Sequence, residues 1–344
     1  MKSFSKIAEI RDIWEGLYKN NSDMSFYQSF LWNQILEKRF YTRHWTKYYN
    51  CSIKYFVCDD QIIAPLVINK TKKEITILGH DESSDYLSFI FKDIKENDVF
   101  CFLLNLSSLY TDYTFVFDKV NERTLFFKYL HHYSSVKSIV CSIQEKVCVG
   151  ISFPQKTLSF YDSLSKSAKQ NYRTAKNRIA KDGLEFKIHH QYSTIQNPLA
   201  QELLCIYSDR RKDCEKGTSV QQSLKAFIKK ILSLLKINKD IDVITCYANT
   251  EKVFLAYITI NDEIAGYCEG QYSNDPSTIT ISRVATNTTY YKYSPGQILF
   301  VDIIEMLKND ISFFDLTRGD EDYKFRLGGQ VHKNFCFCIT KINK

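Results

Sequence analysis

The segment at residues 290–307 restricts the fold most, because a polar run ends in Ser294-Pro295-Gly296 and a strongly apolar stretch follows at once. Serine is favoured just before a helix, since its hydroxyl accepts hydrogen bonds from free amides of the first turn. Proline suits the first helical position, and glycine lets another group approach the backbone closely. The sequence therefore predicts a buried helix whose N-terminal amides are open to an anion such as a phosphate. A capped helix start without a ligand is the alternative.

The length of 344 residues suggests two domains, at roughly 100–200 residues per domain. Hydrophobic residues make up 44% of the chain and charged residues 25%, as is typical of a soluble globular protein. The formal net charge of +7 fits an anionic ligand or surface but does not require nucleic acid. We place the domain boundary where the strand pattern loosens around Pro154, which gives an N-terminal domain at 1–152 and a C-terminal domain at 153–344.

The 11 cysteines are scattered and form no C-x-x-C pair, which indicates reduced thiols in a cytoplasmic protein. No metal is expected, because the adjacent histidine pairs have no cysteines at ligand spacing. The N-terminal residues lack the apolar region of a signal peptide, and no apolar run reaches the roughly 18–20 residues that span a bilayer. We therefore expect a cytoplasmic protein, with at most a peripheral contact at the inner membrane face.

Hydrophobic periodicity predicts a mixed α/β fold. In the first half we expect helices at 7–17, 26–40, 97–109 and 122–132, and strands at 53–58, 62–68, 74–78, 114–117 and 138–142. In the second half we expect helices at 162–182, 198–212, 219–237 and 294–308, and strands at 184–189, 242–247, 253–260, 264–272, 278–284, 312–316 and 335–342.

The helix expected at 162–182 carries two stripes at three- and four-residue steps, and Gly183 suits its end. The apolar stripe consists of Leu164, Ala168, Tyr172, Ala175 and Ile179. The basic stripe consists of Lys166, Lys169, Arg173 and Lys176. The basic stripe is either a platform for an acidic polymer, a lipid-linked sugar diphosphate or RNA, or the solvated face of an amphipathic helix. The lysine-rich helix at 219–237 either lies against a membrane or packs within the second domain.

Three segments of the second half occur in an order that resembles the CelD-like acetyltransferase family of the GNAT superfamily. The basic helix of that family is matched by LSKSAKQNYRTAKNRIAKDG at 164–183, its Ser-Pro-Gly helix by YSPGQILFVDIIEM at 293–306, and its closing element by FFDLTRGDEDYKFRLGG at 313–329. In the first half, the family's aromatic helix start, Pro-Leu strand and Asp-Tyr segment are matched by FYQSFLWNQILEKRF, IIAPLVI and SSDYLSFIF.

The resemblance implies an α/β (α+β) fold of two tandem GNAT-like domains, each a mixed, largely antiparallel sheet flanked by helices, as in the related Fem-type peptidyltransferases. It also implies acyl-CoA as co-substrate, with acetyl-CoA as the expected form. The basic helix departs from the family, since Ala168, Gln170, Asn171 and Asn177 stand where arginines are common. The glycine-rich phosphate loop of single-domain acetyltransferases is absent, so donor binding depends on the Ser-Pro-Gly segment.

Acyl transfer from a thioester to an amine needs a bound donor, an amine that loses a proton and a polarised carbonyl. We expect the amides of Gly296, Gln297 and Ile298 to hold the diphosphate of the donor, and superfamily resemblance implies that amides of the preceding strand polarise the carbonyl. Lys292 or Tyr293 would assist through their side chains, although Lys292 as a solvated loop residue is the alternative. The predicted cofactor-binding residues are Lys292, Tyr293, Ser294, Pro295, Gly296, Gln297 and Ile298.

The closing element supplies most of the candidate catalytic and substrate-binding groups. Candidate catalytic residues are Asp320, Glu321 and Tyr323 in this element and Glu269 on the strand at 264–272, and Asp315 is a further acid that matches the family. Candidate substrate-binding residues are Arg318, Lys324 and Arg173. The alternative is that Arg318, Lys324 and Arg326 form ion pairs with Asp320 and Glu321 that only fix the loop.

These patterns favour an N-acyltransferase that moves an acyl group from acyl-CoA to an amine acceptor. The expected acceptor is a small-molecule or lipid-linked amino sugar, or a peptide-like envelope precursor, because the resemblance points to envelope or exopolysaccharide assembly. Two alternatives stay open: a Fem-like aminoacyl transfer from tRNA, and a non-catalytic scaffold that binds an anionic glycan or a protein partner. The lack of a long coiled-coil insertion counts against the first. No motif that reads bases is present, and the oligomeric state is not fixed by the sequence.

Overall fold

The structure, a computed structural model, describes most of the chain. The described residues are 1–42, 48–80, 84–92, 95–135, 139–153, 159–191, 202–203, 205–207 and 253–342. The helix expected at 219–237, the strand expected at 242–247 and two thirds of the helix expected at 198–212 lie outside the described residues.

The first half follows the expected order of elements. It consists of β1 (Lys2–Phe4), the 3-10 turn η1 (Ile7–Ile10), α1 (Arg11–Lys19), η2 (Phe26–Gln28), α2 (Phe30–Thr42), β2 (Cys51–Cys58), β3 (Ile62–Asn69), β4 (Glu74–Ile77), β5 (Ile90–Phe91), α3 (Glu96–Leu109), β6 (Thr114–Asn121), α4 (Leu125–Ser135) and β7 (Ile139–Ser152). Residues 59–61 connect β2 to β3; Asp59 and Asp60 both have positive φ, and the amide of Gln61 closes the turn by donating to the carbonyl of Cys58 at 2.9 Å.

The second half is likewise close to expectation. It consists of α5 (Phe160–Ser163), α6 (Lys166–Lys181), β8 (Phe186–Gln191), β9 (Val253–Ile260), β10 (Glu263–Tyr272), β11 (Thr278–Thr286), η3 (Thr288–Tyr293), α10 (Pro295–Leu307), β12 (Phe313–Arg318), α11 (Asp322–Arg326) and β13 (Gln330–Ile342). The short elements β1, β5 and α11 are not predicted by the sequence pattern, and β7 and β13 are longer than predicted.

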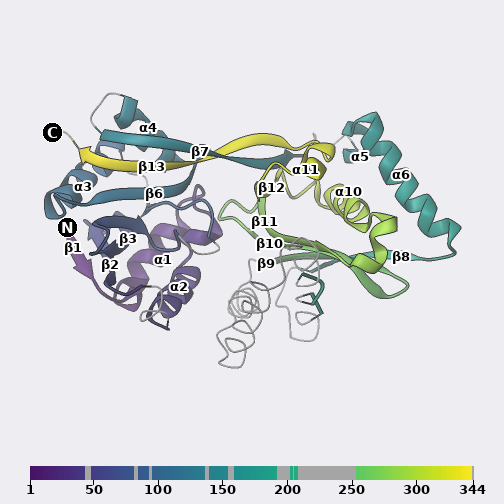
Figure 1. Cartoon of the computed structure of the whole chain (residues 1–344), viewed down its shortest axis with the longest axis horizontal. Coiled ribbons are helices and arrows are strands. Elements are labelled where there is room, and N and C mark those ends of the chain that lie inside the picture. The colour runs from purple at the N-terminus through teal and green to yellow at the C-terminus, as the bar shows by residue number, and fades with distance from the viewer. Residues whose placement is uncertain are drawn as a thin grey trace, which may run out of the picture.

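The described strands form one sheet in the order β1-β2-β3-β4-β6-β13-β7-β12-β11-β10-β9-β8, with β5 on β3. This order is symmetric about the antiparallel contact between β13 and β7. The last strand of the chain lies beside β6 of the first half, and β7 lies beside β12 of the second half. The two halves have therefore exchanged their final strands, and β7 and β13 run across the junction of both (Figure 1).

A strand–helix–strand unit recurs in both halves and accounts for the parallel pairs of the sheet. In the first half α3 connects β4 to the parallel strand β6, and in the second half α10 connects β11 to the parallel strand β12. Each parallel ladder covers three positions, 74–76 with 114–116 and 278–280 with 313–315. The recurrence confirms the prediction of two similar tandem halves, each a largely antiparallel mixed sheet flanked by helices.

Two large apolar clusters underlie the two halves. The cluster of the first half includes Phe335, Phe337 and Ile339 from the exchanged strand β13. The cluster of the second half is built around α10 and includes Ile151 from β7. Separating the halves would expose these side chains, so each half depends on a strand from the other. The predicted domain boundary at 152/153 stays a prediction.

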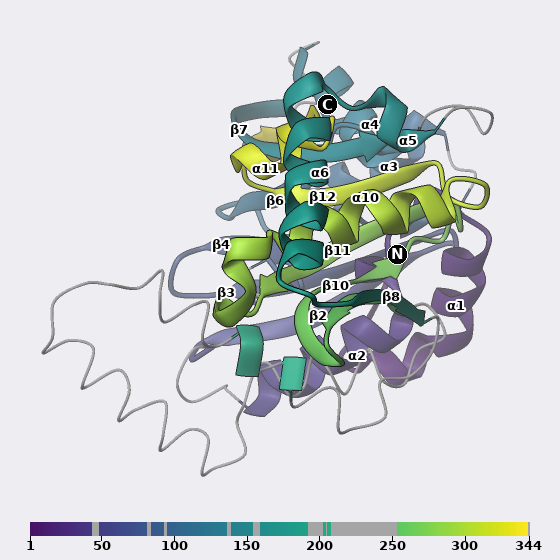
Figure 2. The same ribbon diagram turned by 90° about the vertical axis from the view of Figure 1, so that its right-hand side faces the viewer.

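Helix α6 lies along the outside of the second half next to α10 (Figure 2). Ser165 caps its start by accepting from the amide of Ala168 at 3.2 Å, and Gly183 ends it with φ of +68°. Ala168, Ala175 and Ile179 are buried, which confirms the apolar stripe. The position of α6 matters for the site because its first turn contacts the start of α10.

Candidate active site

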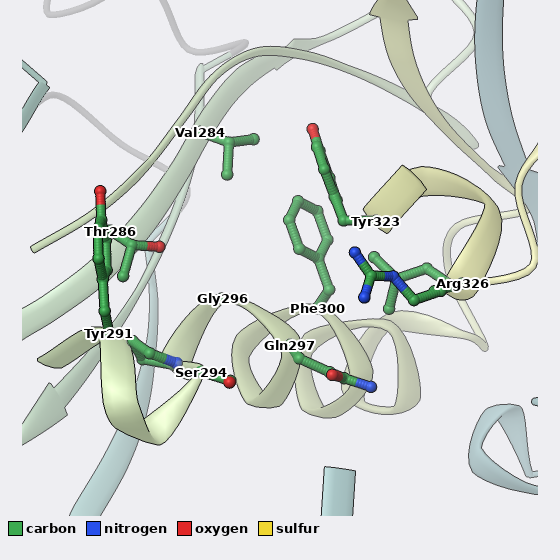
Figure 3. Close-up of a pocket in the computed structure, with 11 residues that line it drawn as sticks. Val284, Thr286, Tyr291, Ser294, Gly296, Gln297, Phe300, Tyr323 and Arg326 are labelled. Atoms are coloured by element: carbon green, nitrogen blue, oxygen red, sulfur yellow. The ribbon is translucent and has the colours of Figure 1, made fainter. Parts of the chain in front are cut away.

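The start of α10 borders a cavity of about 350 Å³, a size typical of small-molecule sites (Figure 3). The cavity lies between the end of β11, the first turns of α10 and the short helix α11. Its lining residues are Val284, Thr286, Tyr291, Ser294, Pro295, Gly296, Gln297, Phe300, Tyr323, Arg326 and Leu327. This donor cavity, as we call it, has aromatic and aliphatic walls and polar groups at the helix start.

Two parallel strands, β11 and β12, separate next to the donor cavity, which β11 lines with Val284 and Thr286. β11 and β12 pair only at 278–280 with 313–315, although β11 continues to Thr286 and β12 to Arg318. Beyond these positions no ladder joins the facing edges of the two strands. Unpaired strand amides at such an opening are donors that a bound carbonyl can accept from.

The start of α10 differs in one respect from the expectation. Pro295 occupies the first turn as predicted, but Ser294 has left-handed backbone angles and its side chain makes no capping hydrogen bond. The prediction of a Ser294 side-chain cap was therefore wrong, because capping requires an extended backbone at that residue. Ser294 instead accepts through its carbonyl from the amide of Gln297 at 3.0 Å.

The amide of Gly296 is one group at this helix start that stays open to an anion. The helix offers it no acceptor, and it makes no backbone hydrogen bond within the described part of the chain. A Cβ at Gly296 would meet only Oγ1 of Thr286, at 3.4 Å. The absence of a side chain therefore keeps the space between α10 and β11 open.

The charge in the donor cavity is positive. None of the described residues that line it is acidic, and Arg326 directs its guanidinium toward the cavity (Figure 3). Arg326 and Tyr323 are three residues apart on α11, so they share one face of that helix. Arg326 is a binding candidate that sequence reasoning missed, although its spacing from Tyr323 was a usable signal.

A second cavity of about 300 Å³ adjoins the first and shares Val284 and Tyr323 with it. Its lining is more polar and comes from β11, the end of β12 and the loop into α11. The lining residues are Tyr207, Ile281, Ser282, Arg283, Val284, Leu316, Thr317, Arg318, Glu321, Tyr323 and Lys324. We call it the polar cavity. Tyr323 is the one predicted catalytic residue that reaches both cavities.

Lys324 organises the turn that borders the polar cavity. Its side chain is only 2% exposed, and Nζ donates to the carbonyls of Arg318 at 2.8 Å and Gly319 at 3.1 Å. Nζ also lies 2.9 Å from the carboxylate of Glu321. These partners use the ammonium within the loop, so the geometry favours the alternative in which Lys324 fixes the closing element rather than binding substrate.

The turn itself is strained. Thr317 has φ of +58°, which is rare for a β-branched residue, and Gly319 has φ of +102°. Such backbone strain costs about 1–3 kcal/mol and persists only where the surroundings enforce it. Besides Lys324, the carboxylate of Asp315 contributes by accepting from the amide of Thr317 at 2.8 Å.

The predicted acids occupy different environments. The side chain of Glu321 is 58% exposed and lines the polar cavity, whereas Asp320 is exposed and lines neither cavity. Glu269 is buried on β10 and pairs with Arg283 at 3.2 Å, so it reaches the polar cavity only through that arginine. Asp315 is buried at the junction of the halves. Of the four acids, Glu321 is therefore the best placed.

Two predicted donor-binding side chains point elsewhere. Nζ of Lys292 lies 2.9 Å from Asp182 at the end of α6, and the hydroxyl of Tyr293 donates to the same carboxylate at 2.6 Å. Both hydrogen bonds lower the pKa of Asp182. Neither Lys292 nor Tyr293 lines the donor cavity, so their predicted role as side-chain helpers finds no support in the geometry.

Further predicted residues serve the packing of α6 on the site. Nε2 of Gln297 donates to the carbonyl of Ala168 at 3.0 Å, which ties α10 to α6, and Ile298 is buried. The guanidinium of Arg173 lies 5.7 Å from the ring of Tyr161, and Arg173 lines neither cavity. Lys169 contacts the same ring. Part of the basic stripe therefore packs on an aromatic side chain.

Comparison with known proteins follows the same division of the chain. Residues 166–325 match the family model described as an acetyltransferase (GNAT) domain. This region runs from α6 into α11 and includes every residue that lines the two cavities except Arg326 and Leu327, so this part of the second half is similar to a GNAT-type domain. No curated protein matches the sequence.

Solved structures share the fold of the whole chain at low sequence identity. The structure of FemX is 9% identical with a TM-score of 0.58, and the match covers 99% of this chain and 98% of that one. A conserved protein of unknown function from Bacteroides thetaiotaomicron is 10% identical with a TM-score of 0.56, covering 98% and 99%. L-PGS from Bacillus licheniformis is 10% identical with a TM-score of 0.52, covering 89% and 91%. At this identity the likeness concerns the fold alone.

None of the helices in the described ranges is long and apolar enough to cross a membrane.

Proposed function

We propose that the protein is an N-acyltransferase that transfers an acyl group from a coenzyme A thioester to a primary amine, with the donor bound in the second half. The observation that carries this proposal is the separation of β11 and β12 in front of the open amide of Gly296. A cavity without described acidic lining residues lies beside β11 at the start of α10 and has Arg326 on its wall. The match of residues 166–325 to a GNAT domain supports the same reaction class.

In this proposal the donor spans the donor cavity. Its diphosphate accepts from the amide of Gly296 and is attracted by Arg326, since helix starts and guanidinium groups both favour phosphate oxygens. The apolar part of the donor passes along Phe300 and Val284. The thioester then lies near Tyr323, the residue that both cavities share.

The first half is not expected to bind a second donor, although it repeats the strand–helix–strand unit. At the corresponding helix start, the side chain of Asp98 accepts from the amide of Lys95 at 2.9 Å, and Glu96 adds another negative charge. These carboxylates repel a diphosphate. The corresponding space beside β6 is filled by the chain itself, because the amide of Leu87 donates to the carbonyl of Lys119 at 3.0 Å.

The reaction assigns a role to each group at the border of the cavities. The neutral amine attacks the thioester carbon, the C–S bond breaks, and the amine loses a proton while the leaving thiolate gains one. Glu321 is the candidate base, directly or through a water, and the phenol of Tyr323 is the candidate proton donor to the thiolate. Amides of β11 beyond Thr280 are the candidate donors to the carbonyl oxygen.

The polar cavity is the proposed acceptor site, and the resemblance to CelD-like acetyltransferases suggests the acceptor. An amino sugar, free or linked to a lipid, or a peptide-like precursor of envelope or exopolysaccharide assembly fits that resemblance. Acetyl-CoA is the proposed donor, and the cytoplasm is the proposed compartment.

Donor binding is tested by titrating coenzyme A, acetyl-CoA and longer acyl-CoAs while following the melting temperature, because a ligand of the folded state raises it by mass action. Gly296→Glu adds bulk and negative charge beside the open amide and should abolish the shift. Gly16→Glu is the matched control, since Gly16 is also helical and a Cβ there meets nothing within 4 Å.

Turnover is then tested by release of free thiol in a screen of amino sugars. The absence of both a melting shift and thiol release with every coenzyme A ligand would reject the proposal, and aminoacyl transfer from tRNA or a binding scaffold would replace it. An equal loss of binding in both glycine variants would contradict the assignment of the site to the start of α10.

A further inference from the structure

The segment of residues 84–86 belongs to the first half but lies at the junction with the second. The indole nitrogen of Trp32 donates to Oγ of Ser84 at 2.9 Å, and Nζ of Lys119 donates to the carbonyl of Ser84 at 2.9 Å. The carbonyl of Tyr86 accepts from Nε2 of Gln28 at 2.7 Å. Three buried donors from three elements thus fix this segment on the first half.

Two consecutive side chains of this segment reach the second half. Oδ1 of Asp85 lies 2.6 Å from Nε of Arg318, with only 9% of the Asp85 side chain exposed. The hydroxyl of Tyr86 donates to Oδ1 of Asp315 at 2.6 Å in a buried contact. The same Oδ1 accepts from the amide of Thr317. The first half therefore contacts the strained turn both through the side chain of Arg318 and through Asp315.

The turn is the part of the polar cavity that these contacts control. Thr317 and Arg318 both line that cavity, and the positive φ of Thr317 is one that a β-branched residue does not keep without support. Lys324 holds the carbonyls of the turn from within the second half. The contacts from Asp85 and Tyr86 come from the first half and involve groups that Lys324 does not hold, namely the side chains of Arg318 and Asp315.

We propose that Asp85 and Tyr86 are positioning residues, through which the first half sets the shape of the acceptor side of the active site. The assignment of the polar cavity to the acceptor comes from the proposed function, whereas the control of the turn rests on the contacts alone. A protein with an intact second half but without these two contacts would bind the donor normally and bind the amine acceptor more weakly.

The variants are Asp85→Asn and Tyr86→Phe, each of which removes one contact and keeps the shape of the side chain. Asp118→Asn is the matched control, because Asp118 is also 9% exposed and also pairs with a partly exposed cation, Lys146 at 3.1 Å. Asp118 lies on β6 and lines neither cavity. A general loss of stability should therefore affect all three variants alike.

The first measurement is hydrogen exchange of the Thr317 amide, which does not depend on any reaction. Exchange should be at least tenfold faster in Asp85→Asn and Tyr86→Phe than in the unchanged protein, and unchanged in Asp118→Asn. Equal exchange in all four proteins would overturn the proposal, whether or not the protein is an acyltransferase. Binding of coenzyme A, measured by titration on the same samples, tests the proposed function separately.

The second measurement is acetyl transfer to glucosamine, followed by thiol release. Asp85→Asn should raise the KM for glucosamine about tenfold and leave the KM for acetyl-CoA unchanged. The double variant Asp85→Arg with Arg318→Asp, which reverses the ion pair, should recover part of the loss. Equal changes in both KM values, or a change of the same size in Asp118→Asn, would reduce Asp85 to a structural residue and contradict the proposal.

Discussion

The carboxylate of Asp85 provides a sharp test of the junction through the pH dependence of stability. Burial raises the pKa of Asp85 from 3.8 to about 6, and the positive charges of Arg318 and Lys119 oppose this shift. A difference of one pKa unit corresponds to about 1.4 kcal/mol, so this displacement corresponds to about 3 kcal/mol. Between pH 4 and pH 6 the folded protein keeps a proton on Asp85 that the unfolded chain has released.

The sign follows from this difference in bound protons. Stability rises with pH only where the unfolded chain binds more protons, so Asp85 lowers the free energy of unfolding as the pH rises from about 4 to about 6. Its contribution is complete at acidic pH and is lost above pH 6. Asn at this position does not titrate. The free energy of unfolding of the unchanged protein, minus that of Asp85→Asn, should therefore fall by about 3 kcal/mol across this range.

Urea unfolding of both proteins at pH 4, 5, 6 and 7 measures this difference, and the other carboxylates cancel in the subtraction as long as their surroundings stay the same. A difference that is constant from pH 4 to pH 7 would refute the claim that Asp85 is desolvated at the junction. A difference that rises with pH would show instead that the ion pair with Arg318 outweighs the burial of the carboxylate.

Three further predictions concern the second half. Tyr323→Phe keeps the ring against Phe300 but removes the phenolic hydroxyl. The kcat should fall about 100-fold, while coenzyme A binding, measured by titration, is unchanged. An unchanged kcat would exclude the phenol as the proton donor. Arg326→Gln should weaken coenzyme A binding about tenfold, and the difference should be smaller at high salt because an exposed guanidinium is screened. Equal affinity of both proteins would show that Arg326 does not bind the donor. Lys324→Met leaves buried carbonyls of the turn without their hydrogen-bond donor. The free energy of unfolding, measured by urea unfolding, should therefore fall by about 3 kcal/mol. A loss below about 1 kcal/mol would contradict the role of Lys324 in the loop.

Much of the fold could be predicted from local patterns in the sequence. The β9–β10 turn at Asn261 and Asp262 has the positive φ values that such residues allow, and the strand at Val253–Ile260 has the predicted bounds. Both depend on neighbours within a few positions. The exchange of β7 and β13 could not be read in this way, because it pairs Gln330 with Gly150 across most of the second half.

The site was predictable to the same extent. The glycine after Pro295 and its open amide follow from local helix chemistry. The shared face of Tyr323 and Arg326 depends on α11, which the sequence pattern did not predict. The orientation of the Lys292 side chain could not be predicted, since its partner Asp182 is 110 residues earlier in the chain. The left-handed backbone of Ser294 also escaped prediction, because serine adopts an extended conformation at most helix starts.

The exchanged strands explain how the second half can depend on the first half for the shape of its proposed acceptor site. In the first half, the chain around Leu87 lies beside β6 and is held there by the hydrogen bond from the Leu87 amide to the carbonyl of Lys119. The same segment presents Asp85 and Tyr86 to the second half, where the corresponding strands stay apart. Because β7 and β13 pair along the junction, the two halves cannot separate without breaking that ladder. The segment that holds Asp85 and Tyr86 therefore has a fixed position beside the strained turn of the second half. The proposed positioning role of these two residues requires such a fixed position.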